Sequence, residues 1–174
     1  MTRMRRPCAR LASPGADALH VPDIYAIDTN VYISALRNAA ELGSLQEFLK
    51  VRGRRVVVAG IVATELRAGA STPRHVEAVD ALIEAYAQRN RTIVPTYQAC
   101  VEGGRVLAAL VARERVVLAK APRSLTADVL LAVTCRERDV VLVTGNHDDF
   151  AAIQRHLRGF RFVAPWPAGP RPYR

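Results

Sequence analysis

Short apolar runs alternate along the chain with longer segments of helical periodicity. The runs are rich in β-branched and aromatic residues and are predicted to be strands at Ile24–Ile27, Val56–Ala59, Thr92–Val94, Val140–Val143 and Phe160–Val163. Most of them are apolar at every position rather than at alternate positions. This pattern indicates strands that are buried on both faces of a sheet.

Two of the intervening segments have the period of an α-helix. Between His75 and Arg89, apolar side chains form one stripe and polar side chains form the opposite face. The stripe consists of Val76, Val79, Leu82, Ile83 and Tyr86, and the polar face consists of Glu77, Asp80, Glu84 and Gln88. A second helix is predicted from Thr96 through Val111. Alternating strands and helices predict an α/β fold, here a three-layer sandwich with a mostly parallel central sheet flanked by helices.

Prolines divide the chain into three parts. Residues 1–22 contain three prolines and no clear periodicity, and they are predicted to be an irregular N-terminal extension that contributes little to the core. Residues 23–163 carry the alternating pattern and form one domain. Residues 164–174, with the sequence APWPAGPRPYR, are predicted to be a Pro-rich C-terminal tail.

Composition excludes several classes of protein. The 174 residues, 50% of them apolar, suffice for one domain with its own core. The three cysteines Cys8, Cys100 and Cys135 are widely spaced, which argues against a disulfide framework or a zinc site. No run approaches the roughly 18 apolar residues of a membrane span, and no apolar segment follows the positive charges of Met1–Arg10. These features predict a cytoplasmic protein that does not enter a membrane.

The net charge is strongly positive. The sequence contains 25 Lys and Arg residues against 16 Asp and Glu residues, for a formal net charge of +9. Nearly all of the basic residues are arginines, whose planar guanidinium group suits phosphate. The charge therefore favours a nucleic acid or an acidic protein as partner.

Four acidic positions stand out because each lies at an end of a predicted strand or helix. Asp28 directly follows the first strand, and Glu65 lies shortly after the second. Asp128 is placed in the first turn of an apolar helix, and a loop containing Asn146 and Asp149 follows the fourth strand. Taken singly, these positions have structural explanations: a helix N-cap for Asp28, a solvated helix residue for Glu65, a helix-dipole interaction for Asp128 and a strand-to-helix turn for the loop.

Taken together, the four positions point to a metal site. In a parallel sheet the carboxyl ends of the strands meet at one edge, where ligands bind. Several carboxylates at one edge repel each other and are costly to keep ionised. Oxygen ligands without cysteine or paired histidine select Mg²⁺ or Mn²⁺.

Four sequence segments resemble the motifs of a known family. The segments YAIDTNVYISAL, VVVAGIVATELRAGA, SLTADVLLAVTC and VVLVTGNHDDF, in this order, are similar to the four motifs of the PIN-domain family, especially the VapC-type ribonuclease toxins. The resemblance extends from Ile24 to Val163. It implies a parallel sheet between helices and a metal-dependent hydrolysis of RNA phosphodiester bonds.

The resemblance also implies roles for individual residues. Asp28, Glu65 and Asp128 match the first three acidic metal ligands of the family, which would make them catalytic. Asn146 and Asp149 both remain candidates for the fourth position, and Asp149 joins the catalytic set.

Residues around these ligands have supporting or weaker assignments. Thr144 matches a hydroxyl that lies beside the acidic cluster in the family. Asp148 has no clear counterpart and ranks below Asp149, and His147 is expected to be an exposed loop residue. Three arginines close to the motifs are candidate contacts to RNA: Arg37, Arg67 and Arg123.

The implied biology is that of a type II toxin–antitoxin pair. The resemblance implies a homodimer and a cognate antitoxin protein, although the extension and the tail depart from the compact toxins of the family. The alternative is a catalytically inactive PIN-like binding or scaffold protein. A phosphate hydrolase of the Asp-x-Asp type is disfavoured because Asn30 stands two residues after Asp28, and a dinucleotide-binding domain is disfavoured because no G-x-G-x-x-G follows the first strand.

Overall fold

The central element is a five-stranded sheet. The computed structural model describes residues 23–113 and 123–166, so the predicted extension and residues 167–174 of the predicted tail lie outside the described residues. The strands are β1 (Ile24–Ile27), β2 (Val56–Ala59), β3 (Thr92–Ile93), β4 (Val140–Val143) and β5 (Phe162–Val163), in the order β3-β2-β1-β4-β5. Every pairing is parallel, which confirms the predicted α/β sheet.

Three strands have the predicted bounds and two are shorter than predicted. β1, β2 and β4 begin and end as their apolar runs indicate, whereas β3 ends at Ile93. β5 begins at Phe162 rather than Phe160, because the Phe160 N–H donates to the Leu157 carbonyl in a turn that contains Gly159 at a φ of 86°. The side chain of Phe160 is nevertheless buried in the core.

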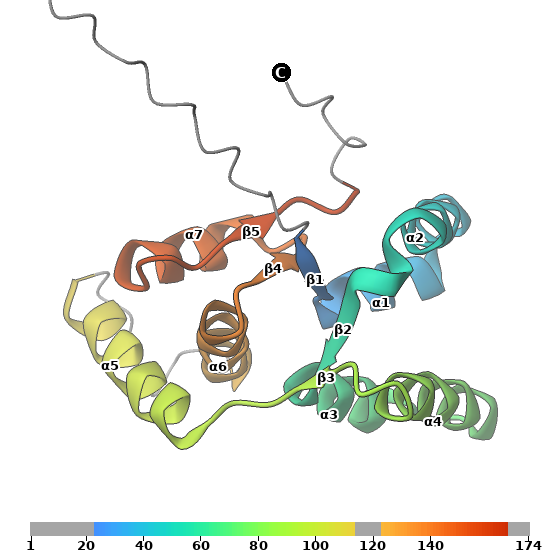
Figure 1. Cartoon of the computed structure of the whole chain (residues 1–174), viewed down its shortest axis with the longest axis horizontal. Coiled ribbons are helices and arrows are strands. Elements are labelled where there is room, and N and C mark those ends of the chain that lie inside the picture. Colours follow the sequence, from blue (N-terminus) through green and yellow to red (C-terminus); the bar gives the residue numbers. More distant parts are fainter. Residues whose placement is uncertain (1–22, 114–122, 167–174) are drawn as a thin grey trace, which may run out of the picture.

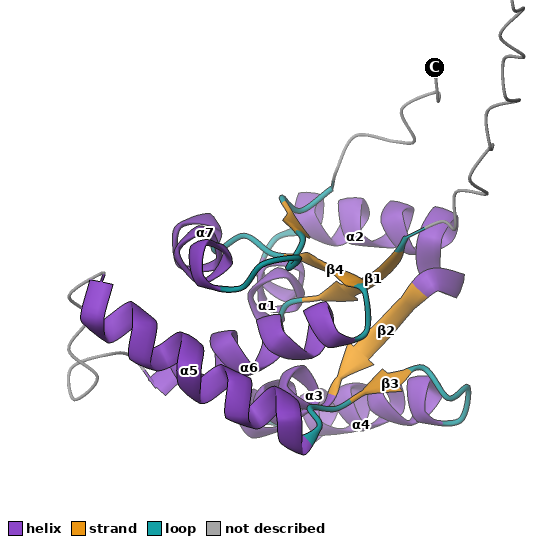
Figure 2. Ribbon diagram, turned by 60° about the vertical axis from the view of Figure 1, so that its left-hand side comes forward, coloured by secondary structure: helices purple, strands orange, loops and turns teal. Residues whose placement is uncertain are grey.

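Seven α-helices surround the sheet within the described ranges. They are α1 (Thr29–Arg37), α2 (Ala39–Arg52), α3 (Gly60–Gly69), α4 (Pro73–Ala87), α5 (Tyr97–Arg113), α6 (Arg123–Glu137) and α7 (His147–His156), and a short 3-10 helix, η1 (Gly53–Arg55), precedes β2. Helices α5, α6 and α7 lie together on one side of the sheet, and α1 and α2 lie on the other (Figure 1). Figure 2 shows the strands as a layer between these helices. This is the predicted three-layer sandwich.

Helix α4 begins two residues earlier than its apolar stripe predicts. The Thr72 side chain accepts a hydrogen bond from the His75 N–H at 3.2 Å, and Pro73 occupies the first helical position, where its missing N–H costs nothing. The predicted stripe is half-buried and the predicted polar face is exposed.

The core follows the apolar runs. All four residues of β4 are buried, as are three of the four residues of β1. Phe150 and Ile153 of α7 are fully buried beneath these strands. Among the described residues, no helix is long and apolar enough to cross a membrane.

Candidate active site

Asp28 lies at the carboxyl end of β1 and is buried, with 4% of its surface exposed. It holds the N-cap position of α1, but its side chain makes no capping hydrogen bond. Instead, its Oδ2 accepts hydrogen bonds from Thr144 Oγ1 at 2.6 Å and from Asn30 Nδ2 at 2.7 Å. Burial raises the pKa of Asp28, and the hydrogen bond from Thr144 partly opposes that change. Helix capping therefore does not account for this carboxylate.

Sheet register places Thr144 beside Asp28. β1 and β4 pair in parallel with Ile27 opposite Val143, and the Asp28 N–H donates to the Val143 carbonyl at 2.9 Å. The residues that follow the two strands consequently lie side by side. Thr144 is fully buried, and its hydroxyl also accepts a hydrogen bond from the Asn146 N–H at 3.0 Å.

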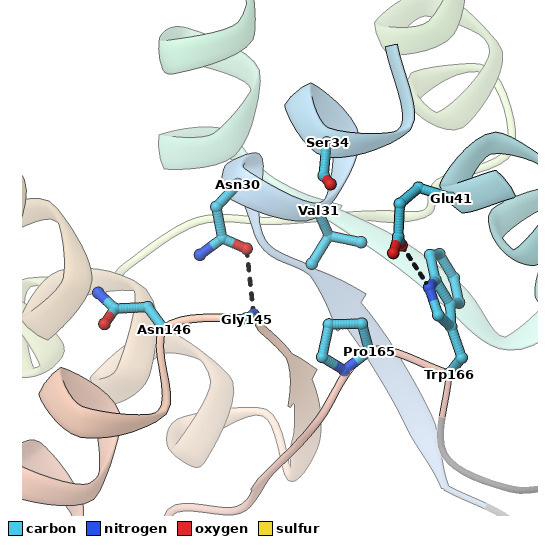
Figure 3. Close-up of a pocket in the computed structure, with 8 residues that line it drawn as sticks. All are labelled: Asn30, Val31, Ser34, Glu41, Gly145, Asn146, Pro165 and Trp166. Atoms are coloured by element: carbon cyan, nitrogen blue, oxygen red, sulfur yellow. Dashed lines mark hydrogen bonds between the residues drawn. The ribbon is translucent and has the colours of Figure 1, made fainter. Parts of the chain in front are cut away.

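Asn30 is a positioning residue whose role is not evident from the sequence. Its Nδ2 donates to Thr144 Oγ1 at 3.2 Å as well as to Asp28, and its Oδ1 accepts from the Gly145 N–H at 3.2 Å. Figure 3 shows this last contact across the gap between α1 and the loop after β4. The available signal was the position of Asn30 in the D-T-N segment, in the first turn of the helix that follows Asp28.

Glu65 lies in the middle of α3 and is half-buried. One of its carboxylate oxygens accepts a hydrogen bond from Thr29 Oγ1 at 2.5 Å. Thr29 is buried at the start of α1, directly after Asp28. The contact joins α3 to α1 and argues against a purely solvated role for Glu65. Thr29 is a second contributor that sequence reasoning missed.

Asp128 is not in the first helical turn, so that prediction was wrong. Helix α6 begins at Arg123 and packs Leu125 against the core, so Asp128 lies in the second turn, where a helix-dipole interaction is weak. Burial and, in decreasing order, the carboxylates of Asp28, Asp149 and Glu65 together raise the pKa of Asp128 to about 7. Three predicted carboxylates thus lie close enough to Asp128 to disfavour its ionisation.

The loop after β4 leads into α7. The Asn146 side-chain amide donates to Asp149 Oδ2 at 2.8 Å, and Asp149 is exposed in the first turn of α7. Asp148 and His147 are also exposed. His147 is exposed as predicted, but it begins the helix rather than lying in the loop, with its ring edge-on to Phe162 at 5.4 Å between centroids.

The oxygen atoms of these residues suit a divalent cation, but their side chains are not arranged as a ready metal site. In residues 23–113 and 123–166, no three His, Cys, Asp or Glu side chains form a group that could hold a metal ion as they stand. The carboxylates that act on Asp128 nevertheless offer oxygen atoms, the ligands that Mg²⁺ and Mn²⁺ prefer. A bound cation would also stabilise the ionised form of Asp128, whose pKa burial and the nearby carboxylates raise.

The three candidate arginines have different surroundings. Arg67 forms an ion pair with Asp80 of α4 at 2.8 Å. Arg37 lines a groove of about 360 Å³ together with Glu65. The side chain of Arg123 lies outside the described part of the chain. Arg37 is therefore the one that lies in a groove with a predicted site residue.

Comparisons with known proteins agree with this geometry. The PIN domain family model matches residues 25–155. VapBC of Salmonella typhimurium, solved bound to DNA, is 25% identical over 84% of this chain and 100% of that chain, with a TM-score of 0.61. VapBC-1 of nontypeable Haemophilus influenzae shares the fold at 22% identity over 81% of this chain and 97% of that chain, with a TM-score of 0.57. FitAB bound to an IR36 DNA fragment shares it at 15% identity over 84% of this chain and 99% of that chain, with a TM-score of 0.63.

No curated protein sequence matches the chain significantly. The family model, however, covers the segments that contain Asp28 and Thr144, and it includes Glu65, Asp128 and Asp149. PIN-domain proteins are generally nucleases that use divalent metal ions. Because the match spans well over half of the sequence and the parallel sheet is that of the VapBC structures, the chain belongs to the PIN-domain family.

Proposed function

We propose that this protein is a divalent-metal-dependent endoribonuclease and the toxin of a type II toxin–antitoxin pair. The observation that carries the proposal is that Asp128 is partly buried close to the carboxylates of Asp28, Asp149 and Glu65, which with burial raise its pKa, at the carboxyl edge of a PIN-type sheet. Desolvation and like charge make this edge unfavourable for bare carboxylates. Such an arrangement is typical of a site that functions with a cation bound.

The proposed ligands of Mg²⁺ or Mn²⁺ are Asp28, Glu65 and Asp128, with Asn146 and Asp149 at the open side. A bound divalent ion would lower the pKa of a water molecule and stabilise negative charge on the phosphate. Asp149 is exposed and so is accessible to the attacking water. All four carboxylates are catalytic in this proposal.

Neutral side chains hold the first of these carboxylates in place. Thr144 and Asn30 both donate to Oδ2 of Asp28, so the orientation of that group is set before any ligand binds. Thr29 orients Glu65 in the same way. Preorganised groups of this kind reduce the cost of reaching the reactive geometry.

A cleavage assay with single-stranded and structured RNA tests the proposal. Activity should require Mg²⁺ or Mn²⁺ and disappear with EDTA, and Asp28→Asn and Asp128→Asn should each abolish turnover without unfolding the protein. Asp148→Asn is the matched control, because Asp148 is exposed beside Asp149 and is not a proposed ligand. Full activity in EDTA would contradict the metal-dependent mechanism.

The proposed partners are RNA, a cognate antitoxin and a second copy of the chain, all in the cytoplasm. The neighbouring solved structures are VapBC and FitAB complexes, which supports an antitoxin partner, and the net charge of +9 favours an acidic one. The groove beside Glu65 also exposes Leu36, 67% of whose surface is accessible.

A short antitoxin gene immediately upstream and growth arrest on expression are expected. A monodisperse monomer by light scattering at micromolar concentration would contradict the homodimer.

A PIN-like binding protein without catalysis is the second candidate. It is favoured by one observation, that the described carboxylates do not form a ready three-ligand group. The same assay separates the two candidates. Binding of RNA without cleavage in both Mg²⁺ and Mn²⁺ would select the binding protein.

A further inference from the structure

A hollow of about 680 Å³ adjoins the carboxylate site on the side of α1 and α2. Asn30 and Asn146 lie at one end of it, Glu41 and Trp166 lie at the other, and Val31 and Pro165 stand between them (Figure 3). Its volume is within the range of about 300–1,000 Å³ that is usual for small-molecule sites. The hollow has apolar sides and a carboxylate at its far end.

The carboxylate of Glu41 is held in position at that end. Trp166 Nε1 donates to Glu41 Oε2 at 2.8 Å, and the indole lies edge-on to the Phe48 ring at 5.9 Å between centroids. None of the ion pairs among the described residues involves Glu41. An ionised carboxylate accepts hydrogen bonds through both oxygens and donates none, so Glu41 retains acceptor capacity toward a ligand with N–H groups.

The near end of the hollow is shared with the carboxylate site. Asn30 donates to Asp28, and Asn146 donates to Asp149, while both asparagines line the hollow. A nucleotide whose base enters the hollow would therefore place its phosphate beside these carboxylates.

We propose that the hollow binds a guanine base of the RNA substrate, next to the bond that is cut; this rests on the proposed function. The Watson–Crick edge of guanine carries two adjacent donors, N1–H and the 2-amino group, which match a carboxylate. Adenine and cytosine present one amino group beside an acceptor nitrogen, and uracil presents one N–H between two carbonyl groups. Proteins read unstacked RNA bases in this way, through edge hydrogen bonds and contacts with the base faces.

The remaining walls suit the flat part of a purine. Val31 and Pro165 contribute apolar surface, and Trp166 contributes an aromatic ring. Glu41 then distinguishes guanine from the other bases, because each of the others would place a hydrogen-bond acceptor next to the carboxylate. A tenfold difference in affinity corresponds to about 1.4 kcal/mol, which lies within the range of about 1–3 kcal/mol by which a good bidentate contact discriminates between bases.

Fluorescence tests the inference without requiring cleavage. Trp166 is the only tryptophan in the sequence, so its emission reports directly on this hollow. The full chain is titrated with GMP, AMP, CMP and UMP in the presence of EDTA. We expect GMP to change the emission at a concentration about tenfold lower than the other three nucleotides. Equal affinity for all four nucleotides, or no change with GMP, would overturn the guanine site.

Two variants on the same helix sharpen the test. Glu41→Gln should remove the preference for GMP, because the amide offers a donor where the carboxylate offers only acceptors. Glu47→Gln is the matched control, since Glu47 is exposed on α2 and pairs with Lys50 at 3.2 Å. An unchanged GMP preference in Glu41→Gln would overturn the role of Glu41.

A third variant separates this inference from the proposed nuclease activity. Asp28→Asn should abolish RNA cleavage and retain the GMP preference, because Asp28 does not line the hollow. A GMP preference in a wild-type protein that cleaves no RNA would support the base site and contradict the nuclease. RNA cleavage by a protein with no GMP preference would contradict the base site alone.

Discussion

Replacing Asp128 by asparagine should stabilise the folded protein at pH 8, although it removes a proposed catalytic group. Folding raises the pKa of Asp128 from its ordinary value of 3.8 to about 7. Between these two pH values the folded state binds a proton that the unfolded state has released. Stability therefore falls as pH rises through this window, and the full penalty is present above about pH 7.

The magnitude follows from the size of that change. Each tenfold change in a proton affinity corresponds to about 1.36 kcal/mol, so the raised pKa corresponds to about 4 kcal/mol. The side chain is only half-buried, and solvent screening reduces the expected gain to roughly 2 kcal/mol. For a chain of 174 residues this is a rise in Tm of about 4–8 °C.

Thermal unfolding of wild type and Asp128→Asn at pH 8 and pH 4.5, in EDTA, measures the effect. The variant should melt at the higher temperature at pH 8, and the difference should shrink toward pH 4.5, where the wild-type carboxyl is protonated in the folded state. Asp148→Asn, an exposed neighbour of the site, should change neither value. A variant that is no more stable at pH 8, or a gain that does not depend on pH, would refute the raised pKa of Asp128.

Three further substitutions probe the surroundings of the site. Thr144→Val removes a buried hydroxyl that donates to Asp28 and accepts from the Asn146 N–H. It should lower the free energy of unfolding, measured with urea, by about 1–3 kcal/mol, and a neutral effect would contradict its positioning role. Phe150→Ala empties a fully buried position and should cost about 3–5 kcal/mol in the same measurement, whereas a loss under 1 kcal/mol would contradict its place in the core. Arg161→Ala breaks two partly exposed ion pairs, with Asp23 and Asp139. It should lower the free energy of unfolding by less than about 1 kcal/mol, and by less still in 1 M salt, where exposed charges are screened. A larger loss that does not depend on salt would contradict this screening.

The order of elements could be predicted because it depends on local periodicity. Continuous apolar runs define β1, β2 and β4 residue by residue, and the helical stripe of α4 is close to its observed position. The predicted ends of strands and helices were less accurate, because these ends depend on specific tertiary contacts. The Phe160 turn shortens β5, and the contact of Leu125 with the core accompanies an earlier start of α6 than its sequence indicates.

The candidate acids could also be selected from the sequence, because strand ends in a parallel sheet meet at one edge. The side chains that form hydrogen bonds with these acids could not be predicted from the sequence. Asn30 contacts Thr144 across 114 positions of sequence, and Thr29 contacts Glu65 across 36. The D-T-N segment places Thr29 and Asn30 beside Asp28, but residue type and spacing alone do not show which side chains they contact.

The sequence by itself determined the fold class, the family resemblance and the chemical nature of the ligands, all of which depend on residue type and spacing. Tertiary structure alone decided how far burial and neighbouring charge raise the pKa of Asp128. It also brought Trp166 to Glu41, 125 positions away, to form the end of a hollow beside the site. Desolvation, Coulombic interaction and side-chain hydrogen bonding depend on distances between remote segments, and local periodicity does not encode those distances.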